Sequence, residues 1–278
     1  MFSTYFVLQA LFSANWAPGL KLRLRSLAQK AFGARMNSYK CKVLEIERFA
    51  EKEKTSYLII RTKKPKGFDY KAGQFVLLGH PKLKDRFNPG QPLFRPYSLA
   101  SAPHMPFLEF AIAVSCTHGL TEFLSEHLTP GDKLVINGPY GDFLHRSKRE
   151  KIVFITTGAG IAPAMSMVRD LMFKASKKVI QFFYGFHSCD QFLYKEELYK
   201  YMNERDNFFL FPTSFKEGPC CWNGTCGYIQ PIVEEAGYRD ENTHFYVCGS
   251  PGSVEATFSV LEKMNVPMEK IFHEAGKR

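Results

Sequence analysis

The protein has 278 residues and a mass of 31.8 kDa, and its 37 Lys and Arg against 27 Asp and Glu give a formal net charge of +10. A hydrophobic content of 45% and a charged content of 23% exclude a wholly disordered chain, and the length corresponds to about two domains. No uninterrupted apolar stretch approaches the roughly 18 residues that a membrane-spanning helix needs. Seven Cys at irregular spacing do not form a disulfide framework, so we expect a reducing compartment.

The positive charge is concentrated near the N-terminus. Seven basic residues precede Glu45, which is the first acidic residue, and the rest of the chain carries a net charge of only +3. The basicity therefore belongs mostly to the N-terminal segment, which includes a tail, residues 1–37, and not to a surface that binds nucleic acid. We expect no nucleic-acid partner.

The tail begins with an uncharged, mostly apolar stretch, Met1–Phe12, and continues with a basic amphipathic segment over residues 20–35. Twelve residues are too short to cross a bilayer. Three interpretations remain: a transit peptide that directs the protein to mitochondria or another organelle, an interfacial helix that makes peripheral membrane contact, or an extra helix that caps the first domain. Without a transit peptide, we expect a cytoplasmic protein.

Short strands dominate the next part of the chain, residues 38–147. The pattern predicts strands at 40–49, 56–62, 74–79, 107–114 and 133–137, and a short helix at 121–128. Residues 108, 110, 112 and 114 are apolar and share one face of their strand. Many short strands with one small helix predict an antiparallel β-barrel domain.

From residue 148 to 278, strands alternate with helices. Apolar strands are predicted at 152–156, 179–184, 208–211 and 244–248, with helices at 162–174, 191–203 and 253–264. This alternation is typical of an α/β domain with a doubly wound parallel sheet.

The first motif with chemical content is Arg95-Pro96-Tyr97-Ser98. On a strand, Arg95 and Tyr97 share one side while Pro96 and Ser98 share the other. A guanidinium, a flat aromatic ring and a small hydroxyl suit the phosphate, ring and ring-edge nitrogen of a flavin nucleotide. An exposed Arg beside a core Tyr is the structural alternative.

Two glycine-containing turns each follow an apolar strand. Thr157-Gly158-Ala159-Gly160 precedes a helix that has Pro163 in its first turn, which favours a pyrophosphate site at the helix N-terminus. The second turn, Cys248-Gly249, ends another strand. Because ligands bind beyond the carboxyl ends of parallel strands, we expect both turns at one edge of the sheet. A purely structural glycine turn is the alternative.

Two further segments, HGLT at 118–121 and GPYGDF at 138–143, complete an ordered set with RPYSLAS, GAGIAP and CGSPG. This set, spread over residues 40–274, resembles the ferredoxin–NADP reductase superfamily. The resemblance implies a barrel that binds FAD, with FMN as an alternative, and an α/β domain that binds NADPH or NADH.

The resemblance also implies roles for individual residues. Ser98, Cys248 and Glu274 would be catalytic, with Ser98 near the flavin N5 and the other two at the nicotinamide. The implied cofactor-binding residues are Arg95, Pro96, Tyr97, Ser98, Gly119, Leu120, Thr121, Thr157, Gly158, Gly160, Pro163, Cys248 and Gly249. Ser214 and Lys216 would bind the 2′-phosphate that distinguishes NADPH from NADH. These two residues slightly favour NADPH as the cofactor.

The implied function is hydride transfer from NAD(P)H to FAD and electron transfer to a ferredoxin, a flavodoxin or an oxygenase component. A membrane-associated enzyme similar to cytochrome b5 reductase and a non-catalytic subunit that keeps the fold are the alternatives. Cys221 and Cys226 match one spacing of an iron–sulfur motif, but Ile229 stands where the next Cys is needed. We therefore expect no metal, and leave a metal-binding or redox role for the 220–226 cluster as the alternative.

Overall fold

A computed structural model describes residues 38–51, 54–84, 92–114, 119–146, 148–215, 222–238 and 242–275. The tail, residues 1–37, lies outside this part of the chain, so its three interpretations stay predictions. None of the described helices is long and apolar enough to cross a membrane.

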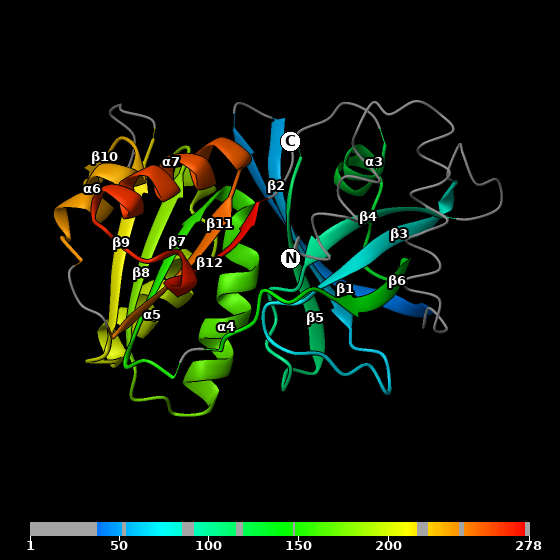
Figure 1. Ribbon diagram of the computed structural model, residues 1–278. Coiled ribbons are helices and arrows are strands. Elements are labelled where there is room, and N and C mark those ends of the chain that lie inside the picture. The colour runs from blue at the N-terminus through cyan, green and yellow to red at the C-terminus, as the bar shows by residue number, and fades with distance from the viewer. Residues whose placement is uncertain are drawn as a thin grey trace, which may run out of the picture.

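The first half forms an antiparallel six-stranded sheet with the order β4-β3-β6-β1-β2-β5. A bridge between Leu99 and Phe110 joins the end of β4 to β5, and the sheet thereby curls into a barrel, as predicted (Figure 1). Its elements are β1 (Ser38–Glu51), β2 (Lys54–Lys63), β3 (Phe75–Lys84), β4 (Pro92–Ser98), β5 (Phe107–Ala113), β6 (Lys133–Tyr140) and the short helix α3 (Leu120–Glu126).

The alternation predicted for β5 determines which side chains fill the barrel. Leu108, Phe110 and Ile112 are all fully buried and belong to one apolar cluster with residues of β1, β3 and β6. Because successive side chains of a strand point to opposite faces, the same register turns Glu109 to the other face of the sheet. That face lies against the second half of the molecule.

The second half is a parallel six-stranded sheet with the order β10-β9-β8-β7-β11-β12 and helices on its two faces, which confirms the predicted α/β class (Figure 1). Its strands are β7 (Lys151–Thr157), β8 (Val179–Phe186), β9 (Phe208–Ser214), β10 (Thr225–Cys226), β11 (Thr243–Gly249) and β12 (Ile271–Ala275). Its helices are α4 (Ile161–Phe173), α5 (Lys195–Glu204), α6 (Ile229–Glu235) and α7 (Pro251–Lys263), with the 3-10 turns η1 (Gly158–Gly160), η2 (Cys189–Gln191) and η3 (Met268–Lys270).

The structure differs from the predicted elements in several places, and α6 and β10 were not predicted. The helix predicted over 191–203 is divided into η2 and α5, because Tyr194 adopts a left-handed conformation with φ of 58° and interrupts the helical path. Strand β12 was not predicted, because the five residues of Ile271–Ala275 are too few to show a periodicity. It pairs in parallel with β11 and carries Glu274.

Helix α4 lies between the two sheets (Figure 1). Its residues from Ile161 to Arg169 are all buried, and most of the apolar ones join one cluster that includes barrel residues as well as residues of β7 and β8. Burial on every side of a helix is expected only where it is enclosed by other elements. The barrel and the parallel sheet therefore share a core through this helix.

A chain of buried ion pairs crosses the same interface. Arg169 of α4 donates to the Glu109 carboxylate at 2.6 Å and to the backbone carbonyl of Ala100 at 2.9 Å, both in the barrel half. The other edge of its guanidinium pairs with Glu197 of α5 through contacts of 2.8 and 2.5 Å. Glu109 is fully buried and also accepts from Arg61 at 2.5 Å. One guanidinium thus bonds the barrel on one side and the α/β half on the other.

Packing and hydrogen bonding both favour the charged forms of Arg169 and Glu197. The Arg169 guanidinium lies 4.9 Å from the centre of the Tyr194 ring, which adds a cation–π contact. Burial by itself would raise the pKa of Glu197, but the hydrogen bonds and charge of Arg169 outweigh it and lower that pKa below its ordinary value. Four hydrogen bonds from the Arg169 guanidinium thereby compensate its burial, as a buried charge requires.

We expect Arg169→Met to lower the free energy of unfolding by about 3–5 kcal/mol, because it removes the buried cation that the Glu109 and Glu197 carboxylates share. Urea denaturation followed by circular dichroism measures the change. Lys174→Met, at the C-cap of the same helix, is the matched control. It breaks an ion pair with Asp170 at a side chain that is 65% exposed, and it should cost less than about 1 kcal/mol. Equal losses in the two variants would contradict the central role of Arg169.

Candidate functional site

Three residues that are far apart in the sequence meet where the barrel faces the carboxyl edge of the parallel sheet. Ser98 is the last residue of β4, and its hydroxyl donates to Glu274 Oε2 of β12 at 3.2 Å. Glu274 pairs in the β11–β12 register with Cys248, which in turn pairs with Thr156 of β7. The barrel therefore contributes a hydroxyl, and the sheet a carboxyl and a thiol, to one place.

Burial changes the protonation of the Glu274 carboxyl. Glu274 is 4% exposed, and burial raises the pKa of its carboxyl to about 8. The Asp142 charge makes a smaller upward contribution to this pKa. The hydrogen bond from Ser98 acts in the opposite direction but is too weak to restore the ordinary pKa. At neutral pH the site accordingly contains a carboxyl group that holds a proton.

The Cys248 thiol is also buried. Burial raises the pKa of the thiol well above the ordinary value, and the Glu274 charge raises it further. A hydrogen bond with the Gly249 backbone lowers this pKa by a smaller amount. A thiol in this state is not a nucleophile, because the thiolate is the reactive form. Its geometry suits a role in positioning a ligand.

The glycine loop before α4 is shaped by contacts within the protein. A side chain at Gly160 would come within 2.7 Å of the Cys248 carbonyl, and one at Gly249 within 2.2 Å of the Thr157 hydroxyl. Gly158 has a φ of +53°, which favours glycine. The loop and the end of β11 thus touch along their backbones, and this packing alone requires the three glycines.

The same loop leads into a helix N-terminus without a side-chain cap. Gly160 is the N-cap of α4 and makes no side-chain capping bond, and Pro163 is the third residue of the helix, as the motif predicted. Uncapped first-turn N–H groups and the helix dipole attract anions. The geometry of the loop is therefore compatible with a pyrophosphate, although the glycines by themselves do not demonstrate one.

Two tyrosines that sequence reasoning missed hold this loop. The Tyr184 hydroxyl on β8 donates to the carbonyl of Gly158 at 3.3 Å. The Tyr57 hydroxyl of the barrel lies on the other side of the loop, where a Cβ atom added at Gly158 would be 2.8 Å from it. Both tyrosines occur in ordinary apolar strands with no motif around them. Only the approach of β2 to β8 across the interface shows that they belong to the site.

Strand β4 lies at the edge of the barrel sheet and carries the Arg-Pro-Tyr-Ser motif. It pairs with β3 and, among the described strands, has no second partner along its length beyond the Leu99 bridge. Its residues 93–98 are all half-buried, and Tyr97 packs partly against the barrel core. Arg95 donates one of the five N–H groups of its guanidinium to the Phe94 carbonyl at 2.9 Å.

Helix α3 lies beside this strand, since it contacts both β3 and β4. Gly119 is its N-cap and has a φ of +104°, a conformation that glycine adopts without strain. No described atom lies within 4 Å of the position that a side chain there would occupy. Leu120 is buried in the barrel core and Thr121 is half-buried, so the open space lies over the backbone of Gly119.

The pair expected at a 2′-phosphate is only partly described. Ser214 ends β9, is fully buried and donates its hydroxyl to the carbonyl of His187 at 3.4 Å. This placement does not favour a contact between Ser214 and a phosphate. Lys216 lies outside the described residues, as do Cys220 and Cys221, so the expectations about these three stay predictions.

Comparison with known proteins gives one family model and a group of curated relatives. The model, described as "Oxidoreductase NAD-binding domain", matches residues 154–258. A subunit of the Na(+)-translocating NADH-quinone reductase of Yersinia pestis is 32% identical over 196 residues, which is 65% of this chain and 48% of that protein. Its counterpart in a Marinomonas species is 33% identical over 150 residues, or 52% of this chain and 37% of that protein. The chain spans about half the length of the curated relatives it matches.

Solved structures share the fold at low sequence identity. A ferredoxin NADP+ reductase from Neisseria gonorrhoeae, with bound FAD and NADP, has a TM-score of 0.74 at 20% identity over 87% of this chain and 100% of that chain. A cytochrome P450 reductase from Amycolatopsis also reaches 0.74 at 20% identity, over 88% of this chain and 72% of that chain. The two-sheet architecture and these likenesses agree: the chain has the fold of these reductases, and its residues 154–258 match an oxidoreductase NAD-binding domain.

Proposed function

We propose that the protein is a flavoprotein reductase that takes a hydride from NADH or NADPH onto FAD and passes electrons to a protein acceptor. The observation that carries this proposal is the contact of Ser98 on the barrel with Glu274 on the parallel sheet, at 3.2 Å, directly beside Cys248. A flavin along β4 and a nicotinamide at the end of β11 would meet at this contact.

The residues present fit a flavin nucleotide. Ser98 follows Arg95 by three positions, which is about 10 Å along a strand, so a phosphate partner and a ring-edge donor are spaced along one edge. The half-buried Tyr97 lies between them, and the open backbone of Gly119 lies near the same strand. We infer that Arg95 and residues 119–121 hold the phosphates, while Pro96 and Tyr97 contact the ring.

A bound flavin would supply the redox chemistry, because it accepts a hydride and releases electrons one at a time. The chain's own residues have three tasks in this proposal. The Ser98 hydroxyl donates a hydrogen bond at the reacting edge of the ring, the Glu274 carboxyl holds a proton at neutral pH, and the uncharged Cys248 thiol fills space against the nicotinamide. Cys248 and Glu274 are buried and Ser98 is half-buried, which limits the access of water to the transfer.

The acceptor is proposed only as a class. The curated relatives are named for an NADH-quinone reductase, and two of the neighbouring structures are a reductase of carbazole 1,9a-dioxygenase and a cytochrome P450 reductase. These names support electron transfer to a separate protein component. A ferredoxin, a flavodoxin and an oxygenase component all fit that class.

We propose that NADH is the preferred donor, in contrast to the NADPH preference that the sequence favoured. The Ser214 hydroxyl is buried, and the next residue, Phe215, is 47% exposed. Its ring packs against those of Tyr228, at 4.9 Å, and His187, at 5.7 Å. A 2′-phosphate needs charged or hydroxyl donors, whereas this described surface is aromatic.

We expect the purified protein to contain flavin, with absorbance near 450 nm, the wavelength typical of oxidised flavins, that NADH bleaches under anaerobic conditions. Arg95→Ala should weaken flavin binding at least about tenfold, because a charge-assisted phosphate contact is lost. Ser98→Ala should keep the flavin but slow its reduction about 10-fold or more. Flavin titration and stopped-flow absorbance measure the two effects.

Arg48→Ala is a matched control for Arg95→Ala, since Arg48 also lies on a barrel strand and bonds the backbone carbonyls of Ser125 and Leu128. It should leave flavin affinity within about twofold of the wild type. A colourless protein that takes up neither FAD nor FMN would refute the reductase proposal, and a normal flavin affinity for Arg95→Ala would refute the phosphate assignment.

We expect Glu274 to make stability depend on pH. The carboxyl has a pKa of about 8 in the folded protein against an ordinary value of 4.5, so the folded state binds the extra proton between these values. Relative to Glu274→Gln, the wild type should therefore be most stable below about pH 4.5 and lose this advantage as pH rises through 8. Urea denaturation of both proteins from about pH 5 to 9 measures the difference, and parallel curves would contradict the raised pKa.

Comparison of NADH with NADPH tests the donor preference. We expect kcat/KM for NADH to exceed that for NADPH by at least about tenfold, which corresponds to about 1.4 kcal/mol. Phe215→Arg should raise kcat/KM for NADPH and thereby lower the ratio of the NADH value to the NADPH value. The reason is that it adds a guanidinium, a phosphate-binding group, directly after β9. A wild-type preference for NADPH would show that groups outside the described residues, such as Lys216, bind the 2′-phosphate.

A further inference from the structure

Helix α4 buries two polar side chains, and both of them bond the segment that follows Ser98. Ser166 is fully buried and Arg169 is 4% exposed, whereas the other buried residues of the helix are apolar. The Ser166 hydroxyl donates to the carbonyl of Ser101 at 2.6 Å, and the Arg169 guanidinium donates to the carbonyl of Ala100 at 2.9 Å. Residues three apart lie on one face of a helix, so this face of α4 holds two consecutive peptide groups of the barrel.

The barrel also holds this segment. Leu99 and Ala100 are fully buried. The Leu99 amide donates to the carbonyl of Gln74 at 2.9 Å, and the Ala100 amide donates to the carbonyl of Glu109 at 2.8 Å. The segment is thus bonded to the barrel and to α4 at once, and it directly follows Ser98.

The same helix begins at the glycine loop of the proposed redox site. Ser166 is five residues after Ile161, the first residue of α4, which is a rise of about 7.5 Å along the helix axis. Immediately before the helix, a Cβ atom added at Gly160 would be 2.7 Å from the carbonyl of Cys248. The path from the Ser101 carbonyl to Cys248 therefore consists of one hydrogen bond, one buried helical segment and one close backbone contact.

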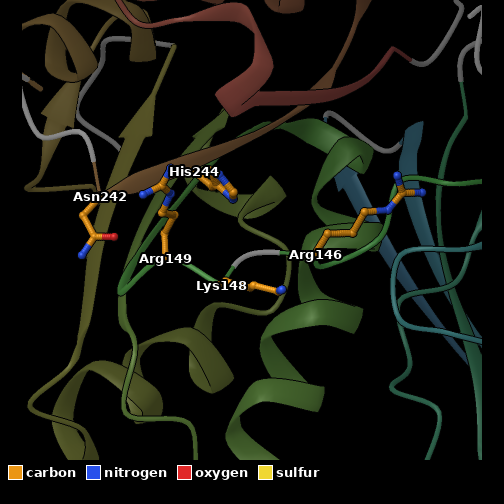
Figure 2. A pocket seen from close by; sticks show the side chains of 5 residues that line it. All are labelled: Arg146, Lys148, Arg149, Asn242 and His244. Atoms are coloured by element: carbon orange, nitrogen blue, oxygen red, sulfur yellow. The ribbon is translucent and has the colours of Figure 1, made fainter.

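The covalent connection between the two halves lies on the surface where it enters the parallel sheet. Arg146, Lys148 and Arg149 of this connection are exposed and border a hollow of about 460 Å³, which Asn242 and His244 also line (Figure 2). A surface segment beside open space is held by fewer contacts than a buried helix. The orientation of the two halves therefore depends more on the contacts of α4 than on this part of the connection.

We propose that Ser166 is a positioning residue for hydride transfer, because its hydroxyl fixes the end of β4 to α4 and thereby fixes Ser98 relative to Glu274. This inference rests on the proposed reductase function, in which the flavin lies along β4 and the nicotinamide lies beside the loop at the start of α4. A small displacement between two reacting rings is enough to slow a transfer strongly. The Ser166 bond therefore controls the rate of transfer and not the binding of either cofactor.

The Ser101 carbonyl keeps a second donor when the Ser166 hydroxyl is removed. The Tyr70 hydroxyl lies 3.0 Å from this carbonyl and 2.9 Å from the Ser101 hydroxyl. Ser166→Ala therefore leaves this buried carbonyl with a hydrogen bond, and it removes the link to α4. An unsatisfied buried group is what makes the loss of a hydrogen bond costly to folding, so this variant separates a loss of position from a loss of stability.

Anaerobic stopped-flow reduction of the flavin in the full chain tests the proposal, with whichever of NADH and NADPH reduces the wild type faster. We expect Ser166→Ala to lower the limiting rate at saturating nucleotide at least about tenfold, because the two rings are bound but misaligned. The dissociation constants of flavin and nucleotide should stay within about twofold of the wild-type values. A loss of about tenfold in either affinity would assign the hydroxyl to binding and overturn the proposal.

Two further variants separate the hydrogen bond from packing and from general destabilisation. Ser166→Cys fills nearly the same space with a weak donor, so it should be as slow as Ser166→Ala. Tyr238→Phe removes the hydroxyl of another buried residue, which bonds Gln181 at 2.8 Å within the α/β half, and it should keep the wild-type rate. A wild-type rate for Ser166→Cys, or an equal loss in Tyr238→Phe, would overturn the proposal.

The Glu274 carboxyl gives a second readout that does not depend on turnover. The hydrogen bond from Ser98 lowers the pKa of this carboxyl, so displacement of Ser98 should raise the midpoint of its titration above that of the wild type. Asp142, whose charge also acts on the carboxyl, is the same in every variant. NMR titration of protein with carbon-13-labelled glutamate should show the rise in Ser166→Ala and in the reference variant Ser98→Ala, but not in Tyr238→Phe. An unchanged midpoint in Ser166→Ala would contradict the positioning role.

The rates also separate this inference from the function on which it rests. A wild type that neither NADH nor NADPH reduces would refute the reductase function and the positioning role together. A wild type that is reduced, with Ser166→Ala reduced equally fast, would overturn the positioning role and leave the reductase function standing.

Discussion

The buried guanidinium of Arg169 is the interaction on which the arrangement of the two halves depends. It is 4% exposed and bonds Glu109 and the Ala100 carbonyl on the barrel side, and Glu197 on the other side. A buried ion pair adds little net stability, but it tolerates few geometries, because each displaced partner would leave an unpaired charge in an apolar surrounding. The pair therefore specifies how the halves fit, while the shared apolar core around α4 supplies the free energy.

The fixed interface determines the proposed redox site. Ala100 and Ser101 closely follow the Ser98 strand, and Ser101 accepts a hydrogen bond from Ser166 of α4 through its carbonyl at 2.6 Å. The end of β4 is thus tied to α4 by two backbone contacts within three residues of Ser98. Helix α4 begins at the glycine loop, so the same rigid element positions the serine, the loop and, through that loop, Cys248. Hydride transfer needs this precision between two separately bound rings.

The positive charge is unevenly distributed along the chain. The sequence assigns seven of the ten surplus positive charges to the first 42 residues, which leaves a net charge of +3 for the rest. The carboxyl edge of the parallel sheet contains a neutral thiol and a carboxyl whose proton is retained at neutral pH. The electrostatics of this edge follows burial and neighbouring charges more than net charge.

The sequence by itself determined the class of both sheets, because alternation such as that of Leu108, Phe110 and Ile112 depends only on the period of the backbone. It also identified Ser98, Cys248 and Glu274 as candidates. Tertiary structure alone decided that Ser98 and Glu274 touch, that Glu274 keeps its proton, and that Tyr57 and Tyr184 hold the Gly158 loop. Those facts, like the enclosure of Ser214, depend on burial and on contacts between residues up to 176 positions apart, which no local pattern records.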